Sequence, residues 1–135
     1  MTTNKYIILD DVAFFEIKGN DKELFLQGLI TNDIFQCTEN ASIYSAFLSP
    51  QGKFIADFFI LNLGQSYLFE TKKKFIDSLI IKFNFYKLRA DIKINKIDNL
   101  YSILIHERNN LFNNLKEKGD TEKINNGHII VDPRN

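Results

Sequence analysis

The segment from Ser42 to Leu63, SIYSAFLSPQGKFIADFFILNL, restricts the fold more than any other part of the chain. Two apolar runs in it are separated by Ser-Pro-Gln-Gly at positions 49–52. Serine first, proline second and glycine fourth suit a type I turn, in which a glycine is free to adopt a positive φ. The segment therefore predicts a β-hairpin.

One acidic residue, Asp57, interrupts the second strand of this hairpin. Residues alternate between the two faces of a strand. One face would carry Phe54, Ala56, Phe58 and Ile60, and the other Ile55, Asp57, Phe59 and Leu61. Because both faces are apolar, the strand is expected to be central in its sheet and Asp57 to be partly buried. A carboxylate in such a place needs a hydrogen bond or an opposite charge.

The partner of Asp57 depends on the length of the hairpin loop. A loop of four residues places Tyr44 opposite Asp57, and a loop of three places Ser45 there. Both side chains are hydroxyl donors. A structural interpretation is an Asp–hydroxyl contact or a solvated strand edge, and a functional one is a carboxylate that receives a ligand in a cavity.

The rest of the chain predicts further strands where β-branched and aromatic residues gather, and helices where apolar residues recur three or four apart. Strands are predicted over 5–9, 12–19, 42–49, 52–63, 66–70, 90–97, 100–106 and 128–132. Helices are predicted over 20–30, 71–86 and 108–119, the first two capped by Asn20 and Thr71. The order ββαβββα followed by ββαβ indicates an α+β fold with a mixed, mainly antiparallel sheet and an incomplete second copy of the first unit.

Length and charge limit the classes of function. The 135 residues suit a single domain over 1–135, and 17 basic and 17 acidic residues give a net charge of zero. Such a balance provides no overall field for nucleic acid or an anionic membrane. The single cysteine, Cys37, cannot form an intrachain disulfide and has no neighbouring ligand for a metal, so we expect a reducing, cytoplasmic location.

Other polar residues have both a structural and a functional interpretation. Asn32, in Thr-Asn-Asp after the first helix, suits a structured turn or a ligand contact. Arg89, just before a strand, suits a surface ion pair or a bidentate carboxylate contact. Lys72–Lys74, in the first turn of a helix, suit a solvated basic face or an anion site.

Four blocks of the chain together resemble the YgfZ-type folate-binding proteins, which are relatives of the glycine-cleavage aminomethyltransferase (T-protein). The blocks are ELFLQGLITNDI, YSAFLSPQGKFIADFFIL, YKLRADIKI and DPR, and they occur in the family's order. The resemblance extends from Lys5 to Arg134 and corresponds to about the first half of a typical member.

The resemblance implies a tetrahydrofolate-binding fold built from a duplicated ββαβββα unit. It also implies a role in assembling or repairing iron–sulfur clusters in client proteins. In the aminomethyltransferases the carboxylate of folate chemistry lies in a G-G-x-x-D-D segment, whose second Asp aligns with Asp57. The resemblance therefore implies Asp57 as the leading catalytic and folate-binding candidate, beside the candidates Tyr44, Ser45, Asn32 and Arg89.

Departures from the family pattern select among the alternatives. Ala56 and Lys53 replace the first Asp and second Gly of the G-G-x-x-D-D segment, which favours the YgfZ branch over an aminomethyltransferase. The K-G-C-x-x-G-Q-E motif of the family's second half has no counterpart here. A shortened chain of this kind is expected to form a homodimer or to bind a complementary chain. A third alternative is a degenerate member of the family that binds a protein partner and no longer binds folate.

Overall fold

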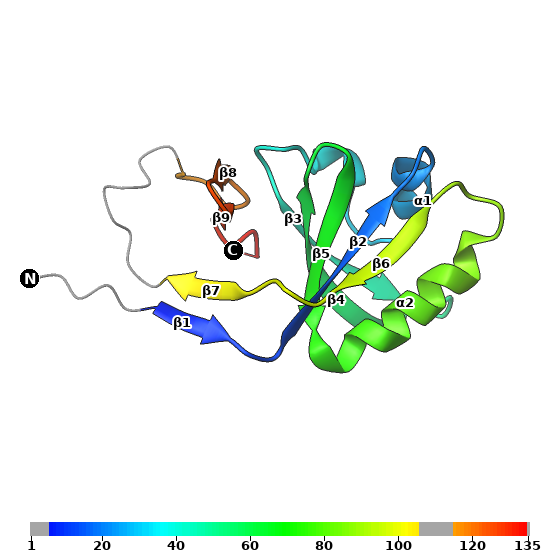
Figure 1. The fold of residues 1–135 in the computed structure, drawn as a ribbon. Coiled ribbons are helices and arrows are strands. Elements are labelled where there is room, and N and C mark those ends of the chain that lie inside the picture. The colour runs from blue at the N-terminus through cyan, green and yellow to red at the C-terminus, as the bar shows by residue number, and fades with distance from the viewer. Residues whose placement is uncertain (1–5, 106–114, 135) are drawn as a thin grey trace, which may run out of the picture.

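The computed structural model describes residues 6–105 and 115–134 (Figure 1). Its elements are β1 (Tyr6–Leu9), β2 (Val12–Lys18), α1 (Lys22–Gln27), the 3-10 helix η1 (Ile34–Gln36), β3 (Ile43–Leu48), β4 (Phe54–Asn62), β5 (Ser66–Lys72), α2 (Lys73–Lys87), β6 (Lys93–Ile97), β7 (Ser102–Ile105), β8 (Thr121–Ile124) and β9 (Gly127–Ile130).

Five strands form the main sheet in the order β3-β4-β5-β2-β6, and each neighbouring pair is antiparallel. The predicted α+β class is therefore confirmed. The strand β4 lies between β3 and β5, so the central position predicted from its apolar faces is confirmed as well. Two smaller antiparallel sheets, β1-β7 and β8-β9, lie beside the main one.

The main core fills the space between the sheet and α2. The ring of Phe83, on α2, meets the edges of rings from three strands, with centroids 5.3 Å from Phe47, 5.9 Å from Phe15 and 6.1 Å from Phe69. The helices lie on this side of the sheet, and the β8–β9 hairpin lies on the other (Figure 1). There Ile130 packs against a smaller cluster of Phe14, Leu61 and Leu68.

The helix α2 forms because Ile76, Leu79 and Phe83 recur at helical spacing and are all buried. The predicted Thr71 cap is wrong, because β5 continues to Lys72 and α2 begins directly after it. The Thr71 hydroxyl instead donates to the main-chain oxygen of Asp57, at 2.9 Å.

The helix α1 is shorter than predicted and has no side-chain hydrogen bond at its N-cap, so the Asn20 cap is also wrong. The Asn20 amide nitrogen instead donates to the carboxylate of Asp91, at 3.0 Å, and so joins this loop to the one before β6. A long-range contact has replaced the local cap.

The strands of the predicted second copy pair with strands of the first unit. The strand β6 lies beside β2, and β7 lies beside β1. The helix predicted over 108–119 falls mostly on 106–114, outside the described residues, and 115–119 are not helical. The strand β8 was not predicted, because its four residues TEKI have too little apolar character to stand out.

Candidate functional site

The turn of the β3–β4 hairpin has the predicted form. The amide of Gly52 donates to the Ser49 oxygen at 2.9 Å, and Gly52 has a φ of 82°. The amide of Ser49 donates to the Lys53 oxygen at 2.8 Å. This is the register of the three-residue loop.

A β-bulge then changes the register before Asp57 is reached. Leu48 faces Phe54 but Phe47 faces Ala56, so Ile55 is an extra residue on β4. Ala46 is consequently the direct neighbour of Asp57. Neither predicted pairing, with Tyr44 or with Ser45, is therefore correct, because counting from the turn does not anticipate a bulge.

Tyr44 nevertheless reaches Asp57 along a diagonal. Tyr44 faces Phe59, two residues beyond Asp57 on the same face, and its hydroxyl donates to the Asp57 carboxylate at 2.5 Å. Diagonal neighbours in a sheet lie within reach of an aromatic side chain. Accepting this hydrogen bond, Asp57 raises the pKa of Tyr44 above its usual value, and burial and the negative charge of Asp57 add to the effect.

Ser45 is buried and points to the opposite face, away from Asp57. Its hydroxyl accepts from the amide of Asn32 at 2.9 Å and lies 3.2 Å from the hydroxyl of Thr31. The Asn32 side chain donates to the Tyr44 carbonyl at 3.0 Å. The Thr-Asn-Asp segment is thus a structured turn bound to β3, and it brings Asn32 to the backbone of Tyr44.

Arg89 is not brought to this cluster. It is exposed in the loop after α2, on the helix side of the sheet, and within 6–105 and 115–134 it forms no ion pair. The structure therefore separates it from the other four candidates.

Two residues near the C-terminus join the cluster, although sequence reasoning gave them no role. Arg134 forms an ion pair with Asp132, and its guanidinium lies 5.0 Å from the centre of the Phe59 ring. The pKa of Asp132 is lowered, chiefly by its hydrogen bond from Arg134. The sequence signal that could have indicated these two residues is the DPR block, Asp132–Arg134, in which both lie.

A second carboxylate lies on the same face of the sheet. Glu70, on β5, is the direct neighbour of Phe59 on one side and of Phe14 on the other. Burial raises its pKa, and the side chain of Ser102 and the charge of Arg134 oppose the change. Sequence reasoning missed Glu70, although an acidic residue in the apolar run SYLFETK is the same signal that marked Asp57.

We name these residues the carboxylate face: Tyr44, Asp57, Phe59, Glu70, Asp132 and Arg134. One oxygen of Asp57 binds Tyr44, and the other, Oδ1, has no hydrogen-bond partner among the described residues. That oxygen can accept a hydrogen bond from an N–H group of a ligand. The rings of Tyr44 and Phe59, with centroids 5.6 Å apart, provide an aromatic surface beside it. A free acceptor oxygen beside an aromatic surface suits a flat ligand that carries N–H groups.

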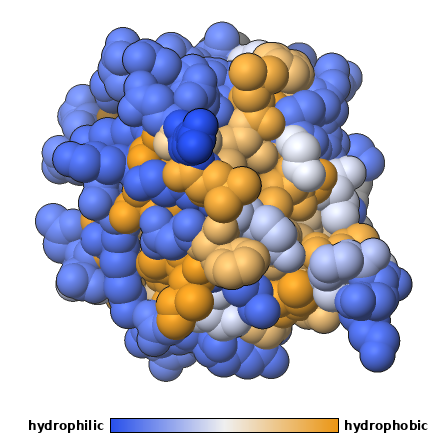
Figure 2. All heavy atoms as spheres, turned by 90° about the vertical axis from the view of Figure 1, so that its right-hand side faces the viewer, coloured by the Kyte–Doolittle hydropathy of each residue, from blue (hydrophilic) through white to orange (hydrophobic). Residues whose placement is uncertain are grey.

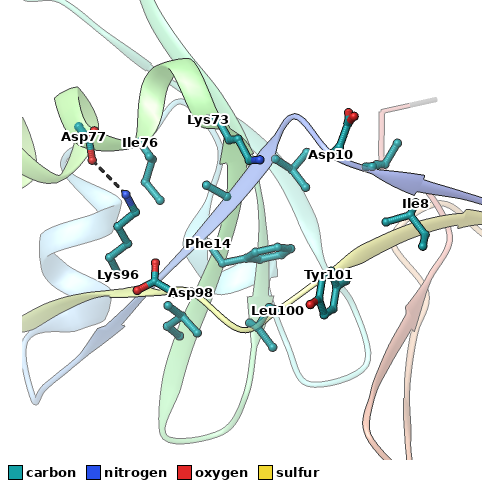
Figure 3. Close-up of a pocket in the computed structure, with 14 residues that line it drawn as sticks. Ile8, Asp10, Phe14, Lys73, Ile76, Asp77, Lys96, Asp98, Leu100 and Tyr101 are labelled. Carbon is teal, nitrogen blue, oxygen red and sulfur yellow. Dashed lines mark hydrogen bonds and ion pairs between the residues drawn. The ribbon is translucent and has the colours of Figure 1, made fainter.

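Two cavities lie elsewhere, and neither is lined by Asp57. The larger, about 470 Å³, lies between the β1–β2 and β6–β7 connections and the start of α2. In Figure 3 Lys73 and Phe14 face this space, and Lys96 is held by an ion pair of 3.3 Å with Asp77 at its edge. Asp57 is partly exposed and lines neither of these two cavities, whereas bound small ligands are mostly enclosed.

The described ranges contain neither a cluster of metal ligands nor a membrane-spanning helix. No group of three or more His, Cys, Asp or Glu side chains there is arranged to hold a metal ion. None of the described helices has the length and apolar character needed to cross a membrane.

Comparison with known proteins gives relatives of two kinds. The chain is 31% identical over 110 residues to the "Iron-sulfur cluster assembly factor IBA57 homolog, mitochondrial" of Coccidioides immitis, covering 69% of this chain and 25% of the relative. It is 30% identical over 88 residues to the "tRNA-modifying protein YgfZ" of Photobacterium profundum, covering 65% and 27%. No protein-family profile matches the chain.

A solved structure shares the fold. The aminomethyltransferase T of the glycine cleavage system from Bartonella henselae superimposes with a TM-score of 0.63 over 68% of this chain and 26% of that one, at 11% identity. The chain thus spans about a quarter of the length of these relatives.

Proposed function

Because the chain is homologous to part of the YgfZ and IBA57 proteins, we propose that it is a tetrahydrofolate-binding accessory factor for the assembly or repair of iron–sulfur proteins. The observation that carries the folate part is the hydrogen bond between Tyr44 and Asp57 on the carboxylate face. It holds one carboxylate oxygen and leaves the other for a ligand.

Asp57 is the central residue of the proposed site. Its free oxygen accepts a hydrogen bond from the pterin or from the N10 region of the folate, and Tyr44 fixes the carboxylate plane. Asn32 supports the site through the Tyr44 carbonyl. We leave Arg89 and Ser45 out of this proposal, because Arg89 lies in another loop and Ser45 on the opposite face.

Thermal denaturation with and without excess 5-formyltetrahydrofolate tests the folate proposal. A ligand at about 100 times its dissociation constant stabilises by about 2.7 kcal/mol, which is a shift of several degrees for a domain of this size. We expect this shift in the wild type and its loss in Asp57→Asn. Absence of a shift in the wild type would refute the folate proposal and favour a degenerate chain that binds only a protein partner.

Asp57 is partly exposed, so a second surface is needed to enclose a ligand. We propose that a second copy of the chain supplies it and is bound through the β1–β7 ribbon. Its residues include no charged side chain, and Ile7 and Ile103 are 61% and 52% exposed. A two-stranded sheet is marginally stable alone, and its edges can pair with another strand. Light scattering is expected to give a dimer, and Ile103→Lys a monomer. A wild-type monomer at high concentration would contradict this.

We propose a cytoplasmic location because the thiol of Cys37 is buried and protonated. The thiol is buried, donates to the Ile60 oxygen at 3.3 Å, and has its pKa raised by burial to about 12. A protonated, unreactive thiol suits a reducing compartment. Cell fractionation checks this proposal, and recovery of the protein in an organelle would contradict it.

A further inference from the structure

The helix α2 is apolar on two opposite sides. Its inner side holds the buried residues Ile76, Leu79 and Phe83. Ile81 and Phe85 lie on the outer side, followed by Leu88 directly after the helix, and they are 69%, 75% and 85% exposed. Ile81 and Phe85, spaced i and i+4, share one side of the helix, and Leu88 follows them just past its last residue. We name these three residues the outer stripe.

Figure 2 shows the side of the molecule that is on the right in Figure 1, where α2 lies. Hydrophobic residues form a band across this face between hydrophilic margins (Figure 2). The fold makes no use of the outer stripe, because the sheet and core lie on the other side of α2. Contiguous exposed apolar surface of this kind marks a site of interaction.

The backbone at the end of the stripe is strained. Leu88 has a φ of 46° and a ψ of −112°, a conformation that residues with a side chain rarely adopt. Residues with strained backbones concentrate at functional positions. Here the strained residue is a leucine that is 85% exposed, at a position where glycine would relieve the strain.

The charges around the stripe indicate the chemistry of the partner. Lys82 and Arg89 are exposed beside it, and neither forms an ion pair with another described residue. Of the acidic residues of the same segment, Asp77 forms an ion pair with Lys96, whereas Asp91 accepts a hydrogen bond from the neutral Asn20 amide and keeps its charge. Lys82 and Arg89 thus flank the stripe as two exposed cations without an ion pair among the described residues, in a chain of zero net charge.

We propose that the outer stripe of α2 binds an amphipathic, acidic helix of a partner protein. Apolar anchors at i, i+4 and i+7 are the pattern by which helices recognise one another, and Glu or Asp beside the partner's anchors would meet Lys82 and Arg89. A second copy of this chain does not fit, because a two-fold interface on the stripe brings these cations close to their own symmetry mates. Two of the anchors are aliphatic, which favours a protein helix over the bases of a nucleic acid.

Fluorescence anisotropy with designed peptides tests the proposal. The probes are amphipathic helical peptides with Leu at i, i+4 and i+7 and Glu at the flanking positions, and their controls carry Lys in place of Glu. We expect the acidic peptides to bind, more weakly at high salt, and the basic ones not to bind. Failure of every acidic peptide, or equal binding of the basic ones, would overturn the proposal.

Variants locate the binding. Phe85→Ser is expected to weaken acidic-peptide binding by about tenfold or more, and Lys82→Glu to weaken it and reduce its salt dependence. Ile124→Ser, on β8 at the other side of the main sheet from α2 (Figure 1), is 46% exposed in the wild type; it is the matched control and should leave binding unchanged. Binding that survives Phe85→Ser would place the peptide elsewhere and refute the inference.

Leu88→Gly separates a docking role from a structural one. Glycine relieves the backbone strain, so the melting temperature rises, while loss of the side chain weakens peptide binding. Unchanged affinity in this variant would remove Leu88 from the site. A dimer abolished by Phe85→Ser, or a single-stranded RNA oligonucleotide that displaces the acidic peptide, would show a different occupant and contradict the proposal.

Discussion

The hydroxyl of Tyr44 donates a 2.5 Å hydrogen bond to the carboxylate of Asp57, although the two residues are not direct neighbours across the strands. The bulge at Ile55 moves Asp57 one position, and the long tyrosine side chain spans the diagonal. A serine in place of Tyr44 would be too short to make this contact. The carboxylate is thus held by a residue on β3 while its other oxygen remains available.

The titration of Tyr44 reports on this contact. Asp57→Asn is expected to lower the pKa of Tyr44 toward its usual value of 10.0, because the charged acceptor that favours the protonated phenol is removed. Arg134→Gln is expected to raise it further, since a positive charge that favours the phenolate is lost. NMR of labelled tyrosine rings, with Tyr44→Phe for assignment, measures both shifts. A pKa of Tyr44 unaffected by Asp57→Asn would contradict the hydrogen bond.

Glu70 makes stability depend on pH. Its folded pKa is raised above the usual 4.5, so on raising the pH the unfolded chain releases this proton first. The stabilisation that Glu70 contributes to the folded state is therefore fully present below pH 4.5, and it is lost as the pH rises through the folded pKa of Glu70. The free energy of unfolding, measured by urea denaturation, should therefore fall as the pH rises through this range. We expect Glu70→Gln to abolish the part of this fall that Glu70 causes. The exposed Glu122→Gln serves as a control; a decline identical in Glu70→Gln and wild type would refute the assignment.

Phe83 is the most connected ring of the core. Phe83→Ala is expected to reduce the free energy of unfolding by about 3–5 kcal/mol, because it removes a fully buried ring and leaves a cavity. Phe85→Ala, on the same helix but 75% exposed, should change it by no more than about 0.5 kcal/mol. Urea denaturation of the two variants measures the contrast. Equal losses would show that α2 packs on the sheet by another side.

Gly19 permits the close approach of two loops. It has a φ of 125°, and a Cβ atom there would lie 2.1 Å from the main-chain oxygen of Asp91. Gly19→Ala is expected to destabilise by about 2 kcal/mol or more, through strain and displacement of the loop. Gly127→Ala is the matched control, because nothing lies within 4 Å of its added Cβ. Similar melting temperatures for the two variants would contradict this.

Local patterns determined much of the fold. The turn at Ser49–Gly52, the apolar alternation of β4 and the helical spacing in α2 are each encoded by neighbouring residues, so each could be predicted. The importance of Asp57 was visible for the same reason, because a carboxylate in an apolar strand conflicts with its surroundings.

Tertiary structure decided the contacts between distant residues. The caps predicted at Asn20 and Thr71 were replaced by bonds to Asp91 and to the Asp57 backbone, since a side chain has no local reason to prefer one oxygen over another. The register beside Asp57 depended on a bulge that no local pattern signals. The sequence by itself thus determined the strands, the main helix and the unusual carboxylate. Only the packed sheet decided that Tyr44, Glu70 and the Asp132–Arg134 pair share its face, because that requires β3, β5 and the C-terminal segment to be brought together in space.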